Sequence, residues 1–286
     1  TEDSAHGQVA TILKLCLVDG FGALAPDSIV WDATEGLAKA SFSGGHSYEK
    51  HSIALLSGVT PTEYNGEHRI MKVATNEVWF ELDTGIEPVD ATVMGELKIA
   101  PLGWSLSHSN AENDILILKP AGDLGNVSLR IDNSAWAGWS GSYARHCKVA
   151  MVEDVVDINT YTTIFEHVLP ATDRYSSGGW ELIGNSAICW FIPCYANANK
   201  FTPFPLGYID SHRVGDRYHF IMSHLATTDM GNNANRWDLT GSSYLTYGYG
   251  IKNNVITQNV IARKHHQLEG TTAFKKQGMG SYGSDV

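Results

Sequence analysis

The sequence predicts a mainly β protein (α+β), built from β-sandwich or barrel-like sheets with an N-terminal helix and a small inserted β module. Three observations support this prediction. Glycine, tryptophan and tyrosine are abundant, at 28, 8 and 12 residues, which suits short strands joined by tight turns. Short segments in which apolar and polar residues alternate recur along most of the chain. One segment near the start instead repeats its apolar residues at helical spacing.

The composition excludes several classes of protein. With 286 residues, 43% of them hydrophobic and 18% charged, the chain can bury a sizeable core, so it is neither a disordered tail nor a small disulfide scaffold. Its net charge of −11 argues against a nucleic acid held by electrostatic attraction. No apolar run reaches the roughly 18 residues that a membrane span needs, and the first residues are acidic and polar. We therefore expect no membrane partner and no cleaved leader.

The predicted helix lies near the start of the chain. Its apolar residues recur at i, i+3, i+4, i+7 and i+8, which places them on one face of a helix. Gly20 is placed to end the helix, because glycine readily adopts the backbone conformation found just past a helix C-terminus. We expect the apolar face to pack on a sheet. The face consists of Val9, Ile12, Leu13, Cys16 and Leu17.

A small β module is predicted from about His46 to Ala100. Two strands, 68–74 and 78–83, flank a tight turn, as in a β-hairpin. About 50 residues make only a marginal core, so we expect this module to be an insertion whose ends lie close together. The predicted organisation is a helix and the first part of a main β domain at 1–45, the inserted module at 46–100, the continuation of the main domain at 101–175 and a C-terminal β domain at 176–286.

Further strands are predicted through the rest of the chain. Ala150–Ile158 is the only other stretch with helical texture, and 187–193 is apolar on both faces, which is typical of a central buried strand. The last residues, 275–286, are rich in glycine and serine and are expected to form an outward-reaching arm. The other strand-like segments are Ile115–Leu118, Val127–Ile131, Arg217–Met222 and Val255–Ala262.

The sequence contains no recognisable cofactor or metal motif. Five histidine and aspartate residues cluster late in the chain, but their spacing matches no zinc-binding pattern. Cys189 and Cys194 lack a second pair to complete a tetrahedral site, and buried free thiols are expected for all four cysteines. No phosphate-binding glycine loop occurs. We therefore expect no metal and no cofactor. The clustered residues are Asp210, His212, Asp216, His219 and His224.

Catalytic patterns are also missing. The segment Gly138–Ser142 resembles a nucleophile elbow, but it has serine where the second glycine of G-x-S-x-G is required. Glu153, Asp154 and Asp157 cluster, as glycoside hydrolysis would need, and helix-surface charge is the alternative that we favour. We expect no enzyme activity and no catalytic residue.

Aromatic residues are dense in the middle of the chain. Flat rings can stack on sugars, whereas in a glycine-rich β protein they more often fill a core or a subunit interface. We expect Trp136, Trp139 and Tyr143 to lie in an interface between subunits. A lectin-like glycan-binding role for the aromatic residues, including Trp180 and Trp190, stays open as the alternative.

Several motifs, in order, resemble a family of tailed-bacteriophage proteins that usually have no assigned function. The segment Thr11–Gly22 is similar to the family's opening helix, which ends in C-L-V-D-G-[YF]-G, and Glu63–Phe80 resembles its E-Y-N-G β insert. Later segments resemble further strands of the family, but Asn133 and Asn185 stand where it usually has aspartate. These later segments are Val127–Asn133, Lys148–Ile158, Trp180–Asn185, Gly207–Ser211, Gly215–Tyr218 and Ala262–Arg263.

The resemblance implies a structural protein of the virion, made in the bacterial cytoplasm and located in the tail or the head-to-tail connection. The expected partners are copies of itself in a homo-oligomeric ring and other virion proteins. DNA would be only a cargo that passes an acidic lumen without sticking. A capsid decoration protein and a receptor- or glycan-binding tail module are the alternatives.

Overall fold

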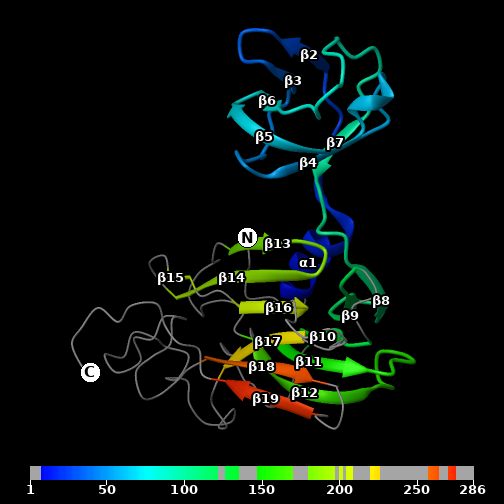
Figure 1. The fold of residues 1–286 in the computed structure, drawn as a ribbon, viewed down its shortest axis with the longest axis vertical. Helices are drawn as coiled ribbons and strands as arrows, with labels where there is room; N and C mark the ends of the chain where they lie inside the picture. Colours follow the sequence, from blue (N-terminus) through cyan, green and yellow to red (C-terminus); the bar gives the residue numbers. More distant parts are fainter. Residues whose placement is uncertain are drawn as a thin grey trace, which may run out of the picture. The chain divides into compact units, whose positions relative to one another are not determined.

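The protein is mainly β in a computed structural model, as predicted, with one helical segment near its start (Figure 1). The structure describes residues 8–121, 126–134, 147–169, 180–196, 200–201, 204–208, 220–225, 257–263 and 270–274; side chains are described in most of these, up to Met222. The described strands form three antiparallel sheets. The chain divides into two compact units. Unit 1 contains the chain up to Val18 and from Leu102 onward, and unit 2 is Asp19–Pro101.

The helical segment follows the predicted pattern. Helix α1 (Gln8–Lys14) continues into a π-helix, η1 (Leu15–Asp19), and every residue of the predicted apolar face is buried. Gly20 ends the segment with a φ of +74°, and a Cβ there would lie 2.6 Å from the carbonyl oxygen of Ile99. Both features require glycine at this position. The predicted helix and its glycine stop are therefore confirmed.

Unit 2 is one seven-stranded sheet around a single core. The strand order is β1-β7-β4-β5-β6-β3-β2. The hairpin of β5 and β6 is the one that the sequence predicts. The core includes Ile29, Ala40, Leu56, Ile70 and Phe80, which come from five different strands. The strands are β1 (Phe21–Leu24), β2 (Ser28–Asp32), β3 (Leu37–Ser41), β4 (Ile53–Ser57), β5 (Gly66–Ala74), β6 (Glu77–Phe80) and β7 (Glu96–Ile99).

The inserted module therefore begins earlier than the sequence predicts. The boundary at residue 46 falls inside unit 2, because β3 pairs with β6 and β2 pairs with β3 in the same sheet. Ile29 on β2 and Ala40 on β3 are fully buried in the core that β6 also lines. A break at residue 46 would expose this core, so the compact unit has to include the strands before it.

The edge of the unit 2 sheet at β2 is covered by the segment between β6 and β7. The backbone N–H of Trp31 donates to the carboxylate of Asp90 at 2.9 Å, and the N–H of Ala91 donates to the carbonyl of Ile29 at 2.9 Å. Tyr64 holds the same segment, because its hydroxyl accepts the N–H of Val89 at 3.1 Å. Backbone groups that an edge strand would leave open are thus occupied.

Unit 1 contains a five-stranded sheet and a second, larger sheet, which pack together through β11, β12, β17 and β19. This is the sandwich-like arrangement expected from the sequence (Figure 1). The first sheet has the order β12-β11-β10-β9-β8, and helix α1 contacts β9. Its strands are β8 (Ser105–Ser109), β9 (Ile115–Lys119), β10 (Ser128–Asp132), β11 (Cys147–Glu153) and β12 (Thr162–Leu169).

The second sheet of unit 1 has the order β13-β14-β16-β17-β18-β19, and β15 pairs with β14. The five-stranded sheet is built from residues before 175 and the second sheet from residues after it, and the two sheets pack together in unit 1. The predicted boundary between 101–175 and 176–286 therefore does not separate two compact units. The predicted arm at 275–286 lies outside the described residues. The strands are β13 (Trp180–Gly184), β14 (Ile188–Ala196), β15 (Lys200–Phe201), β16 (Phe204–Tyr208), β17 (Phe220–Leu225), β18 (Thr257–Arg263) and β19 (Gly270–Phe274).

Two local predictions in unit 1 are wrong. Ala150–Ile158 is not helical, because Ala150 and its neighbours pair in β11 between β10 and β12, and the chain then turns. The segment 187–193 lies almost entirely in β14, which runs on past Pro193 between β13 and β16, but it is not buried on both faces, since the Trp190 side chain is exposed. Glu153 ends β11, and Asp154 and Asp157 lie after it, so none of the three predicted acidic residues lies on a helix surface.

We predict that Leu13→Asp lowers the free energy of unfolding by more than about 3 kcal/mol, because Leu13 is fully buried and the substitution buries an unpaired charge. Thr11→Asp is the matched control, since Thr11 is exposed on the same helix. Urea titrations followed by circular dichroism measure both. Equal unfolding midpoints for the two variants would show that the buried position of Leu13 is incorrect.

We also predict that replacing Asp19–Pro101 with a short Gly-Ser linker leaves unit 1 folded. The chain leaves and re-enters unit 1 at neighbouring points, because the N–H of Leu102 donates to the carbonyl of Cys16 and the N–H of Trp104 donates to that of Leu17, each at 2.9 Å. The chemical-shift dispersion of NMR spectra and the circular dichroism spectrum show whether unit 1 is folded. The same linker in place of 46–100 should give an unfolded or aggregated protein, because it removes β7 from β1 and β6 from β3 and leaves only the pair of β2 and β3. Equal behaviour of the two proteins would contradict the boundary at Asp19.

Candidate functional site

Buried polar residues lie along strand β10 and directly after it. Ser128, Asp132 and Asn133 are each at most 5% exposed, on the strand or directly after it. Asp132 lies in register with Lys148 on β11 and with Ile115 on β9. Since burying charged and polar groups is costly unless they are paired, this is the part of unit 1 in which a function of the side chains has to be tested first.

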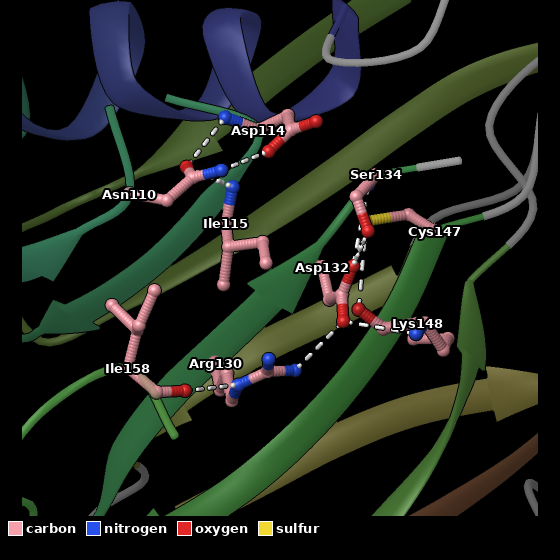
Figure 2. A network of polar contacts seen from close by, with 9 residues as sticks. All are labelled: Asn110, Asp114, Ile115, Arg130, Asp132, Ser134, Cys147, Lys148 and Ile158. Carbon is pink, nitrogen blue, oxygen red and sulfur yellow. Dashed lines mark hydrogen bonds and ion pairs between the residues drawn. The ribbon is translucent and has the colours of Figure 1, made fainter. Parts of the chain in front are cut away.

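Three side chains converge on the carboxylate of Asp132 (Figure 2). The Arg130 guanidinium lies 3.1 Å from Oδ2, and the Lys148 ammonium lies 2.9 Å from the same oxygen. The Ser134 hydroxyl donates to Oδ1 at 2.6 Å, and the backbone N–H of Ser134 donates to it at 3.2 Å. Both carboxylate oxygens are therefore occupied.

The surroundings of Asp132 stabilise its charged form. Burial alone would raise the pKa of this carboxyl, but the hydrogen bonds from Ser134 and Lys148, together with the positive charges of Lys148 and Arg130, outweigh it and lower the pKa. A general acid needs the opposite shift and a path to a substrate. The carboxylate thus remains ionised at neutral pH and holds its neighbours in place.

Arg130 extends this network to the turn between β11 and β12. Its Nε donates to the carbonyl of Ile158 at 3.2 Å, and its guanidinium lies 5.3 Å from the centre of the Tyr161 ring. The turn itself is fixed by Asp157, whose carboxylate accepts the N–H groups of Asn159 and Thr160. Asp157 therefore acts as a turn residue in the structure.

Two asparagines connect the network to helix α1. Oδ1 of Asn133 accepts the N–H of Val9 at 3.0 Å, which caps the first turn of the helix from a distant strand. The N–H of Asn133 donates to the carbonyl of Asp114 at 2.8 Å. Asn110 fixes Asp114 in turn, since its Oδ1 accepts the N–H groups of Asp114 at 3.1 Å and Ile115 at 2.9 Å (Figure 2).

Asn185 also has a structural position. Its Oδ1 accepts the N–H groups of Ala187 and Ile188 in the turn between β13 and β14, and its carbonyl accepts the indole N–H of Trp104 at 3.1 Å. At Asn133 and Asn185, where the phage family usually has aspartate, the side chains therefore accept backbone N–H groups that stabilise a helix start and a turn.

The three cysteines whose side chains are described are buried free thiols, as predicted. Burial raises the pKa of the Cys16 thiol to about 12, and it also raises the pKa values of Cys147 and Cys189. Thiols held in the neutral form are poor nucleophiles and poor metal ligands. The Cys194 side chain lies outside the described residues.

Several predicted residues cannot be placed. Trp136, Trp139 and Tyr143 lie outside the described residues, as do the segment 138–142 and four members of the late histidine and aspartate cluster. The side chain of its fifth member, His224, is not described either. Within the described part of the chain, no three His, Cys, Asp or Glu side chains come together as a metal site. None of the helices described there has the length and apolar character of a membrane span.

The second sheet of unit 1 carries an exposed apolar pair, of which the sequence predicted only Trp190 as a possible surface residue. Ile183 on β13 and Trp190 on β14 lie directly opposite each other, with 61% and 39% of their surfaces exposed. Strand β13 ends the order of the described strands in this sheet. An apolar run predicts burial of every residue, and only the pairing of the strands shows which of them face outward.

The chain matches none of the protein families, curated proteins or solved structures with which it was compared.

We predict that Asp132→Asn lowers the free energy of unfolding by about 2–3 kcal/mol at neutral pH, because it leaves Arg130 and Lys148 near a neutral group in a largely buried site. The lowered pKa means that this stabilisation is complete above the ordinary carboxyl pKa, near about 4, and is lost as the pH falls through the lower value in the folded protein. The difference between wild type and variant should therefore shrink in acid.

Urea titrations between neutral and acidic pH measure this difference. Asp157→Asn is the control, because that carboxylate is exposed and an amide oxygen can still accept the N–H groups of the turn. If Asp132→Asn matches the stability of wild type at neutral pH, the ion pairs do not stabilise the fold.

Proposed function

We propose that this protein is a structural component of a tailed-bacteriophage virion, in the tail or the head-to-tail connection, and that copies of it assemble into a closed ring. The ordered motifs from Thr11–Gly22 onward support the phage family. The contacts of Asp132, Asn133 and Asn185 support a structural rather than a catalytic use of the polar residues that these motifs contain.

The observation that carries the proposal of assembly is the exposed pair of Ile183 on β13, an end strand of the described part of the sheet, and Trp190 on β14. Exposed aromatic and aliphatic side chains that lie side by side on a sheet favour contact with another protein surface. The two end strands of the described part of this sheet are β13 and β19, and they differ in sequence. An edge-to-edge contact between unlike strands of successive copies is heterologous, which is the kind of contact that closes a ring.

The charge of the chain fits a position around passing DNA. Each subunit has a net charge of −11, so a ring of these subunits repels the phosphate backbone of DNA instead of binding it. Within this proposal, Trp136, Trp139 and Tyr143 contribute further contacts between subunits, because aromatic residues are enriched among the residues that dominate binding at interfaces.

We predict that the wild-type protein forms rings and that Trp190→Glu gives monomers or open chains, because a charge at this contact has no partner. Light scattering after size-exclusion chromatography measures the assembly state, and electron microscopy of negatively stained samples shows closure. Val156→Glu is the matched control, since Val156 is a more exposed apolar residue in the turn after β11. It should assemble like the wild type. Assembly of Trp190→Glu into normal rings would show that the contact lies elsewhere.

The position in the virion needs a separate test. Mass spectrometry of purified particles should detect the protein, and imaging of a tag on it should place the label at the tail or neck with ring symmetry. A label spread over the capsid would favour a decoration protein. Specific binding on a glycan array, with the label at fibre tips, would contradict the ring and favour a receptor-binding module.

A further inference from the structure

Unit 2 contains a buried histidine whose two ring nitrogens both face backbone carbonyl oxygens. His68 on β5 is 4% exposed. Its Nδ1 lies 2.9 Å from the carbonyl oxygen of Glu81, and its Nε2 lies 2.8 Å from that of Tyr64. Carbonyl oxygens only accept hydrogen bonds, so each contact needs an N–H on the ring. A neutral imidazole has one N–H and can satisfy only one of the two contacts.

His46 in the same unit has a different arrangement. Its Nε2 lies 3.1 Å from the carbonyl oxygen of Glu77, and its Nδ1 accepts the backbone N–H of Tyr48 at 3.2 Å. One ring nitrogen donates and the other accepts, which is the pattern of a neutral imidazole with its proton on Nε2. The two histidines therefore form an internal comparison, in which only His68 needs both ring protons.

The contacts of His68 tie together three elements of unit 2. Tyr64 ends the 3-10 helix η2 (Thr62–Tyr64), His68 lies on β5, and Glu81 directly follows β6. The ring packs against Phe80, with centroids 5.4 Å apart, and β4 places Ala54 in register with His68. The titratable and charged side chains on these elements are Glu63 and Tyr64 of η2, Glu67, Arg69 and Lys72 of β5, and Glu77 and Glu81 of β6 and the residue after it.

These charged groups do not replace the carbonyl partners of the ring. Glu67 and Arg69 flank His68 on the strand, so alternation directs them to the opposite face of the sheet. The Tyr64 hydroxyl is bonded to the backbone of Val89, and Lys72 is paired with Glu35 at 2.7 Å. The carbonyls of Tyr64 and Glu81 are thus the groups that decide which protonation state of His68 fits the site.

We propose that His68 is a proton-dependent lock, which holds η2 and the end of β6 against β5 when both ring nitrogens carry a proton. Loss of one proton places a ring lone pair against a carbonyl oxygen in a buried site, which is unfavourable and weakens one of the two ties. The doubly protonated ring therefore stabilises unit 2, and loss of one ring proton removes part of this stabilisation.

NMR of the full chain with ¹⁵N-labelled histidine tests the protonation state directly, with His68→Gln used to assign the ring signals. From their hydrogen-bond partners, we expect His68 to show two protonated ring nitrogens and His46 to show one at about pH 6. A neutral ring at His68 under these conditions would overturn the proposal, and this outcome does not depend on how any variant folds.

Thermal unfolding of the full chain and hydrogen exchange of peptides that cover η2 test the consequence. We expect the advantage of wild type over His68→Gln in melting temperature to shrink by several degrees between about pH 5 and about pH 8, with faster exchange in η2 at the higher pH after correction for the intrinsic rate. His46→Gln is the control and should show the pH dependence of wild type. If the melting temperatures of wild type and His68→Gln change in parallel with pH, the proposal that protonation of His68 stabilises unit 2 is wrong.

Discussion

A helix end that is buried must find hydrogen-bond partners outside the helix, and in this chain the partners come from distant segments. At the start of α1, the N–H of Val9 is capped by Asn133. At the other end, the carbonyls of Cys16 and Leu17 accept N–H groups from the chain that returns after unit 2. The helical segment therefore fixes the end of β10 at one end and the re-entry of the chain at the other.

The sequence predicts those parts of the fold that local patterns specify. The helix with its buried Leu13 and the hairpin of β5 and β6 follow from periodicity and turn residues. The start of unit 2 does not, because β2 and β3 belong there only through pairing with β6, which lies far along the chain. The segment around Ala150 shows the other limit, since a short apolar run fits both a helix and a strand until its neighbours are known.

Sequence patterns do not predict the polar site either, because its contacts depend on which strands pair. Asp132 is one acidic residue among 31 acidic residues, and only the pairing of β10 with β11 brings Lys148 to it. Once paired, the carboxylate acts as a fixed anion that orients Arg130, which in turn holds the carbonyl of Ile158. Such a network favours one arrangement of these strands over others.

The insertion of unit 2 between Val18 and Leu102 also imposes an order on biosynthesis. A ribosome makes the helix first and then the whole of unit 2, before it makes β9, β10 and Asn133, which cover and cap that helix. During this interval the apolar face around Leu13 has no partner from unit 1, and nascent chains with exposed apolar surface are aggregation-prone. The length of the insert and the rate of translation therefore set how long this apolar face waits for its partners.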